Sequence, residues 1–414
     1  MGFVDPFAAV IASFCFLGVM LYKRVNLGIT LNATALFLAL LSLGWQNIPT
    51  IIFETTVDLL TISVVLATFG IMLLSQLYKE TGVINRLSES LSRIIKKSKV
   101  VLSVLPAVIG FLPVAGGALM SAPLVDSEAE KLKLKQEKKA YVNLWFRHTI
   151  FPVYPISQLL IATAALTETA MSLIIFRQIP VVIVMIIVGY VVGFRKVSNS
   201  KNKDKPNAKN SLNSDLQDFF IAFSPILATI VVVIGLGLIG SGLSEQGFDV
   251  LIATLVGLVL LIIVSKINLQ VFVKPFRSWG IYGITFAAYG AFLLRNTMVA
   301  AGISEIFKAL VTNGSVDIIL FLTVVPSILG ILTGSPLAGV SISVSILAGT
   351  LTFMPETAAL LYISAYLGYV IAPTHLCFTF TADYFRCSLG KVYKYVIPSF
   401  LISFATALLI YFMF

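Results

Sequence analysis

Two histidines and one arginine are the residues of this chain whose types and positions best suit chemistry. His148 and His375, the only histidines among 414 residues, each lie near a proline inside a long apolar run. Arg147 directly precedes the first of them. An ionisable side chain at membrane depth is costly, so its presence indicates ligand binding or proton transfer. The alternative for Arg147 is a side chain that extends to the lipid headgroups. Arg295, near the end of another apolar run, has the same two interpretations.

Two short segments rich in glycine and proline interrupt apolar sequence elsewhere. They read PVAGG at 113–117 and TGSP at 333–336. Proline has no amide hydrogen and glycine relaxes the backbone, so a continuous helix is not expected at either segment. In lipid, the backbone groups freed by such a break need partners within protein or beside a polar cavity. We therefore expect two re-entrant hairpins, at about 100–127 and 318–350, whose tips contribute to a binding site.

The predicted site combines these tips with the two interrupted spans that contain the histidines, at about 141–166 and 358–382. Half-helix N-termini with free amides suit an anion, whereas hydroxyl and carbonyl oxygens suit a sodium ion. Sodium or the proton is the expected coupling ion, and neither a catalytic residue nor an organic cofactor is predicted. The candidate sodium ligands are Thr333, Ser335 and Thr374. The full set of candidate binding residues is Pro113, Ala115, Gly116, Gly117, Arg147, His148, Thr333, Gly334, Ser335, Pro336, Pro373, Thr374 and His375.

The two halves of the chain share a pattern that indicates an internal duplication. Positions 106 and 326 are both proline and positions 110 and 330 both glycine, and each pair differs by 220. The same offset relates the glycines at 70 and 290 and those at 82 and 302. We expect a first repeat at 1–197, a cytoplasmic linker at 198–215 and a second repeat at 216–414. Interrupted segments at matching places in two halves are the best sequence indication of a secondary transporter's site.

The composition is that of a polytopic, all-α membrane protein. Apolar residues make up 58% of the chain, charged residues only 12%, and the mean hydropathy is +0.98. The three cysteines lack metal-ligand spacing along the sequence, so the sequence supports neither a disulfide nor a zinc site. Ten apolar runs are long enough to cross a bilayer. They lie near 6–22, 29–45, 57–78, 141–166, 172–194, 219–240, 249–265, 279–297, 358–382 and 393–413.

The distribution of basic residues predicts the topology. Short cytoplasmic loops carry an excess of Lys and Arg, and lysines flank the first break on both sides while acidic residues dominate the flanks of the second. The first hairpin should therefore enter from the cytoplasm and the second from outside. Each repeat then has five crossings, which inverts one relative to the other. Both termini are expected outside the cytoplasmic membrane. The net charge of +10 reflects this topology rather than a nucleic-acid partner.

The two tips and the segment GYVIAPTHLCFTFTADYF at 368–385 carry a family resemblance. The chain resembles the ion transporter superfamily, which includes dicarboxylate/sodium symporters, citrate carriers and gluconate permeases. Within it, 368–385 is similar to an uncharacterised family of integral membrane proteins. The resemblance implies an elevator-type carrier, often a homodimer, in which hairpins and broken spans move together. The paired Ser-Asn-Thr signatures of the symporters are replaced here by PVAGG and TGSP.

This architecture is compatible with three functions. The expected one is a secondary active transporter of a small organic anion of carboxylate type, embedded in the lipid bilayer. The alternative is an intramembrane enzyme that uses His148, His375 and Asp383 on a lipid-linked substrate. The sequence has neither an HExxH nor a GxSxG element, which disfavours the enzyme. A channel is disfavoured because no repeated filter or charged ring is evident.

Overall fold

The computed structural model describes residues 4–95, 97–112, 117–197, 209–239, 247–302 and 317–413. In these residues the regular structure consists of α-helices and short 3-10 helices, without a strand. The prediction of an all-α membrane protein is therefore confirmed at the level of fold class. The predicted linker lies mostly at 198–208, outside the described residues, and so do Pro113, Ala115 and Gly116 of the first tip.

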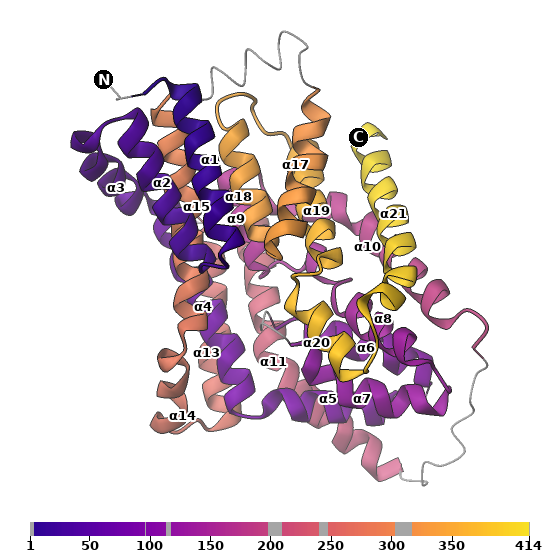
Figure 1. Cartoon of the computed structure of the whole chain (residues 1–414). Coiled ribbons are helices and arrows are strands. Elements are labelled where there is room, and N and C mark those ends of the chain that lie inside the picture. The colour runs from indigo at the N-terminus through magenta and orange to yellow at the C-terminus, as the bar shows by residue number, and fades with distance from the viewer. Residues whose placement is uncertain are drawn as a thin grey trace.

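The helices form a bundle in which α9, α18 and α20 lie toward the centre and the short α3 and α14 lie at the edge (Figure 1). Before the linker they are α1 (Pro6–Tyr22), α2 (Leu27–Ser42), η1 (Trp45–Asn47), α3 (Ile48–Val57), α4 (Leu59–Glu80), α5 (Val83–Ile94), α6 (Ser98–Gly110), α7 (Ala118–Lys131), α8 (Gln136–Arg147), η2 (Phe151–Val153), α9 (Gln158–Leu166) and α10 (Met171–Phe194). After it they are α11 (Lys209–Ile239), α13 (Phe248–Ser265), α14 (Leu269–Val273), η3 (Lys274–Arg277), α15 (Trp279–Ala300), α17 (Ile318–Thr333), α18 (Pro336–Leu347), α19 (Pro355–Ile371), α20 (Leu376–Tyr384) and α21 (Leu389–Met413).

Seven segments of the described chain are long and apolar enough to cross a membrane. They are Leu59–Glu80, Gln136–Leu166, Met171–Phe194, Asn213–Ile239, Phe248–Ser265, Pro355–Tyr384 and Leu389–Met413. The protein is therefore a multi-pass membrane protein. The predicted runs at 6–22 and 29–45 correspond to α1 and α2, of 17 and 16 residues. Helices of that length measure about 25 Å, which is less than the ~30 Å thickness of a hydrocarbon core. The ten-crossing topology stays a prediction.

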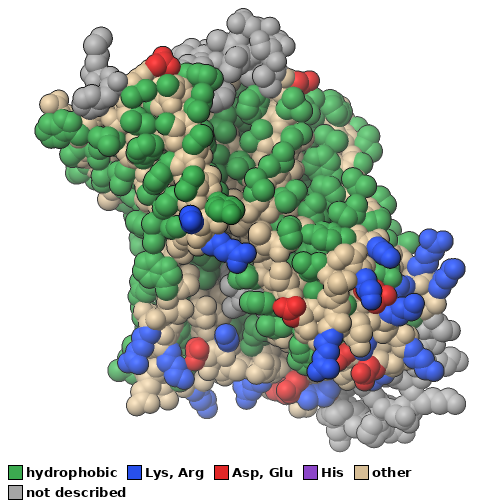
Figure 2. All heavy atoms as spheres, viewed as in Figure 1, with side chains coloured by type: hydrophobic (Ala, Val, Ile, Leu, Met, Phe, Trp, Pro, Cys, Tyr) green, Lys and Arg blue, Asp and Glu red, His purple; other side chains and the backbone are tan. Residues whose placement is uncertain are grey.

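Charge is distributed unevenly along the bundle. Figure 2 shows Lys and Arg side chains gathered at the lower end, around α5, α7 and α14, below a broad apolar surface. Acidic side chains stand at the upper end, where α1 and α17 begin. A separate basic group lies about half way down, where α1 turns into α2. Lys23 and Arg24 follow α1 at this turn.

Helices from before and after the linker are interleaved. Asn32 of α2 donates from Nδ2 to the carbonyls of Gly28 and, on α15, Phe286, both at 2.8 Å. On the other side of the molecule Tyr141 of α8 and Ser399 of α21 share a hydrogen bond of 2.7 Å. Buried polar groups need such partners, so these bonds fix pairings between distant parts of the sequence. The two parts of the chain accordingly form one packed body.

Small residues bring α17, α18 and α19 into close contact. A Cβ on Gly330 of α17 would lie 2.5 Å from the carbonyl oxygen of Ala365 on α19, and one on Gly368 would overlap the backbone of Ser327. Because lipid is as apolar as the helices, close backbone approach through small residues is a main source of helix association in membranes. The shared packing of α17 and α19 places the end of α17 beside the break between α19 and α20.

Candidate functional site

The helix breaks surround one cavity of about 290 Å³ near the middle of the bundle. Its walls come from α2 and α15 on one side and from α8, α9 and α18–α20, with their connections, on the other. The volume suits a small molecule. The lining residues are Asn26, Leu27, Arg147, His148, Phe151, Ser157, Gln158, Leu159, Gly283, Ile284, Ala287, Gly334, Ser335, Pro336, Leu337, Tyr366, Tyr369, His375, Leu376 and Cys377.

The tip between α17 and α18 forms one part of this wall. Gly334 has φ +62°, a left-handed conformation that glycine adopts without strain, and it ends α17. Thr333 Oγ1 donates to the carbonyl of Leu329 at 2.7 Å and accepts from the amide of Ser335 at 3.1 Å. Pro336 then begins α18, where its missing amide is tolerated. Gly334, Ser335 and Pro336 line the cavity, whereas Thr333 does not.

The break between α19 and α20 lies against this tip. Thr374 Oγ1 donates to the carbonyl of Ile331 at 3.1 Å, and a Cβ on Gly334 would be 2.7 Å from Thr374 Oγ1. The structure thus places Thr333, Ser335 and Thr374 in neighbouring segments, but of the three only Ser335 lines the cavity. Pro373 and Thr374 are exposed and are not part of the cavity wall. Sodium binding stays a prediction.

The two histidines meet although 227 positions, 375 minus 148, separate them in sequence. His148 follows α8 and His375 precedes α20, and their ring centroids are 4.8 Å apart with planes at 86°. Tyr369 lies on the second ring, with centroids 3.9 Å apart. Both histidines are buried and line the cavity. Sequence reasoning placed each in a broken span but did not predict that the rings are in contact.

Arg147 is the cation of the site. Its side chain is only 2% exposed, and Nη2 donates to the carbonyl of Leu112 at 3.0 Å. Nε and Nη1 have no hydrogen-bond partner in the described part of the chain. Because the side chain is buried and donates to a backbone carbonyl, it does not snorkel to the headgroups, and that interpretation of Arg147 is wrong. Leu112 directly precedes the first tip in sequence, so this hydrogen bond holds the guanidinium close to the start of that tip.

A polar cluster beside the first tip was not found from the sequence. Asn143 of α8 donates to the carbonyl of Ala118 at 2.8 Å and accepts from Ser121 Oγ at 2.6 Å. Asn143 Nδ2 also lies 3.4 Å from Thr381 Oγ1 on α20. Gly117, the one described residue of the predicted first-tip set, directly precedes α7 and is buried. An asparagine inside an apolar run was the signal that could have revealed this cluster.

Two other predicted groups lie apart from the cavity. Arg295 forms an ion pair with Glu168 at 2.5 Å and does not line the cavity, so it is not an anchor for a ligand there. Asp383 is exposed near the far end of α20 and is likewise absent from the wall. The triad of His148, His375 and Asp383 that an enzyme would need is therefore not assembled in this cavity.

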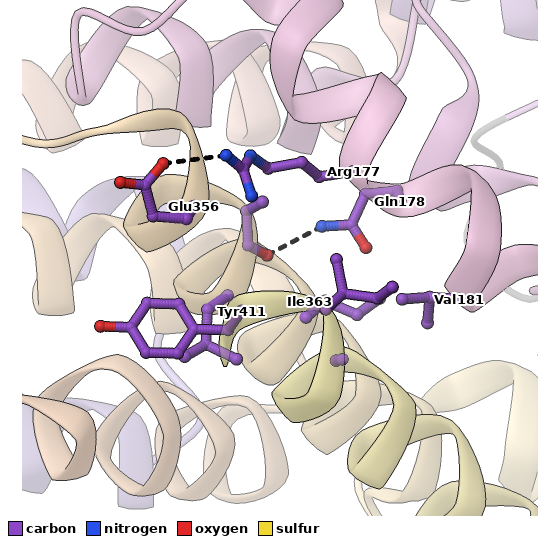
Figure 3. Close-up of a pocket in the computed structure, with 10 residues that line it drawn as sticks. Arg177, Gln178, Val181, Glu356, Ile363 and Tyr411 are labelled. Carbon is purple, nitrogen blue, oxygen red and sulfur yellow. Dashed lines mark hydrogen bonds and ion pairs between the residues drawn. The ribbon is translucent and has the colours of Figure 1, made fainter. Parts of the chain in front are cut away.

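A second, much smaller hollow lies between α10, α19 and α21 (Figure 3). Arg177 of α10 pairs with Glu356 of α19 at 3.1 Å, and the neighbouring Gln178 donates to the carbonyl of Ala359 at 2.8 Å. Tyr411 of α21 closes the hollow from below. These contacts join α10 to α19, so the hollow is a structural junction rather than a binding site.

Fold and cavity together define a polytopic helical membrane protein with a cavity of about 290 Å³ that both apolar and polar side chains line. The fold is similar to that of the YdaH transporter of Alcanivorax borkumensis, with a TM-score of 0.63 and 14% identity over 89% of this chain and 88% of that one. It is also similar to MtrF of Neisseria gonorrhoeae, from a class of antimetabolite efflux pumps, with a TM-score of 0.53 and 14% identity over 90% and 85%. No curated protein matches the sequence.

Residues 8–414 match the family described as "Protein of unknown function (DUF401)", and the chain belongs to that family. This confirms the resemblance to an uncharacterised protein family.

Proposed function

We propose that this protein is a secondary active transporter of a small organic anion of carboxylate type in the cytoplasmic membrane. The observation that carries the proposal is Arg147, a buried cation in the wall of the cavity, two of whose nitrogens find no partner among the described residues. Guanidinium groups bind carboxylates through paired N–H donors. A substrate carboxylate would supply the charge and acceptors that the described residues do not.

The fold supports transport rather than catalysis. Broken helices that surround a cavity in the bundle are the arrangement of secondary transporters, and both similar structures belong to proteins named as a transporter or an efflux pump. The cavity also lies between two groups of helices, α2 and α15 against α8–α9 and α18–α20. This division suits an elevator. The homodimer and the coupling to sodium or protons are proposed from the resemblance to the ion transporter superfamily.

Ligand screening with the purified full chain is the first test. A bound substrate stabilises the folded protein by mass action, so thermal unfolding is measured across a panel of organic acids, with and without sodium. Stabilising acids then enter an uptake assay with proteoliposomes. Arg147→Gln should abolish stabilisation and uptake, because the neutral amide leaves a carboxylate without its countercharge. Arg177→Gln is the matched control, since that arginine lies in an ion pair outside the cavity.

The result separates the candidates cleanly. Retained uptake by Arg147→Gln at wild-type rates would show that the cavity arginine does not bind the substrate. Turnover of a lipid-linked phosphate by the purified protein, without any flux, would favour the intramembrane enzyme. Sodium-dependent stabilisation that is lost in Ser335→Ala would support sodium coupling at the second tip.

The elevator is tested with a cross-link across the cavity. Ile284 of α15 and Leu337 of α18 line it from opposite groups of helices. A short bifunctional thiol reagent between cysteines at these positions should stop transport. The control pair is Ser327 of α17 and Ser364 of α19, two closely packed helices, where Ser327 Oγ donates to the carbonyl of Ser364 at 3.0 Å and neither residue lines the cavity. Transport that continues with the cavity bridged would favour a local gate instead.

A further inference from the structure

Three side chains with metal-binding atoms converge at the edge of the cavity. One ring nitrogen of His148, one of His375 and the thiol sulfur of Cys377 all lie within 4.8 Å of one another. The three side chains are at most 4% exposed, and all line the cavity. The two histidines come from different broken spans, and only the fold assembles the group. Neither anion transport nor the sodium prediction uses Cys377.

The hydrogen bonds of the histidines leave their metal-binding atoms available. His148 Nδ1 lies 2.7 Å from the carbonyl oxygen of Leu144. A carbonyl only accepts, so Nδ1 carries the proton and Nε2 presents a lone pair. This is the arrangement by which proteins orient histidine ligands of metals. Neither ring nitrogen of His375 has a hydrogen-bond partner in the described residues. A buried imidazole without partners is costly, and a metal ion would satisfy it.

We propose that His148, His375 and Cys377 bind one thiophilic transition-metal ion of the zinc class. Two imidazoles and a thiolate form a donor set that favours zinc and similar ions over sodium, magnesium or calcium, which prefer oxygen. Binding displaces the thiol proton of Cys377 to solvent, so the thiolate neutralises one positive charge of the ion. The thiolate thereby lowers the repulsion between the ion and the guanidinium of Arg147, which directly precedes His148.

The spacing requires only a small contraction. Zinc bonds of about 2.1 Å to nitrogen and 2.3 Å to sulfur imply separations of roughly 3.5 Å between tetrahedral donors. The three donor atoms of His148, His375 and Cys377 lie within 4.8 Å of one another, so their separations need to shorten by at most about 1 Å, which side-chain rotation can supply. Three protein ligands leave the fourth position open to the cavity, the pattern of sites that accept water or a further ligand. The ion would thus form part of the cavity wall, whether or not the protein transports an anion.

Cobalt is the probe for this site, because Co²⁺ replaces zinc and its spectrum reports the ligands. The full chain, purified in detergent and stripped with a chelator, is titrated with Co²⁺ alone. One equivalent should give the visible bands of a tetrahedral ion and a near-ultraviolet band of thiolate-to-cobalt charge transfer, and Zn²⁺ should abolish both. Cys377→Ser should lose the charge-transfer band and bind at least tenfold more weakly. Cys15→Ser and Cys387→Ser, outside the cluster, should leave the spectrum unchanged.

A second measurement does not depend on the folding of a Cys377 variant. In the double variant Cys15→Ser/Cys387→Ser, Cys377 is the only thiol, and Zn²⁺ should slow its alkylation by N-ethylmaleimide at least tenfold. Protection should disappear in His375→Ala. A wild-type protein without tetrahedral cobalt bands, a cobalt spectrum without a thiolate band, or alkylation unaffected by Zn²⁺ would each overturn the site. The cobalt spectrum and the alkylation rate of Cys377 do not depend on whether the protein takes up an anion, so they test the metal site separately from the proposed transport.

Discussion

The tip at Gly334 permits a quantitative test of how the second break is held. Gly334→Ala puts a methyl group on a residue at φ +62°. That Cβ would lie 2.7 Å from Thr374 Oγ1 and 2.9 Å from the carbonyl oxygen of Thr374. Both distances are shorter than side chains tolerate, and the carbonyl belongs to the backbone of the α19–α20 connection. The substitution should therefore push the tip away from the wall of the cavity.

Two separate costs lower the free energy of unfolding of the Gly334→Ala variant. A left-handed conformation costs a non-glycine residue about 1–2 kcal/mol. Overpacking against a fixed neighbour adds about 1–3 kcal/mol. Gly82 isolates the first cost, because it has φ +70° at the end of α4 and a Cβ there would meet no described atom within 4 Å. We expect Gly82→Ala to lower the free energy of unfolding by about 1–2 kcal/mol. Gly334→Ala should lower it by this amount and, in addition, by the cost of overpacking.

The assay is thermal inactivation of both variants in the same detergent and at the same scan rate, since unfolding of large proteins is often irreversible. Gly334→Ala should have a clearly lower midpoint than Gly82→Ala. Equal midpoints would refute the contact with Thr374 and, with it, the packing of the tip on the α19–α20 break. A midpoint above the wild type in both variants would refute the left-handed conformations.

Three further predictions concern the frame around the cavity. Arg177→Met should cost about 1–2 kcal/mol, between the values of exposed and buried ion pairs, and the exchange Arg177→Glu/Glu356→Arg should restore the thermal midpoint; a silent single variant would contradict the junction. Asn32→Asp should destabilise more than Asn32→Ala, because a carboxylate would face the two carbonyls that now accept from the amide; the reverse order of midpoints would contradict that pairing. In intact cells and a cysteine-free background, Glu54→Cys should react with an impermeant thiol reagent and Lys135→Cys should not, and the opposite result would invert the predicted topology.

Local backbone signals were the part of the site that the sequence could predict. The breaks arise from the local backbone preferences of Gly334, Pro336 and Pro373, so they can be predicted without knowledge of the fold. The break near Pro152 was predicted for the same reason, and the short η2 at Phe151–Val153 occupies it. Composition alone was sufficient for the class of fold, because few other proteins have so little charge and so many apolar residues.

Proximity between distant segments was beyond the sequence. Cys377 has no metal-ligand spacing along the chain, and its nearness to His148 arises only when α20 packs beside α8. Arg295 was a candidate anchor because it lies near the end of an apolar run, and its ion pair with Glu168 is formed only in the fold. A single sequence contains no record of such pairings, since they depend on how helices over a hundred residues apart are packed.

The pairing of α2 with α15 has a consequence for synthesis. Asn32 finds its partner Phe286 only 254 residues later. At a translation rate of about 5–20 residues per second, the first helices wait in the membrane for roughly 13–50 s before the helix that completes them emerges. During that interval the amide of Asn32 has only its own helix to bond to. A ribosome that stalls before α15 would thus leave behind an incomplete bundle, and a chaperone or protease of the membrane has a defined surface on which to recognise it.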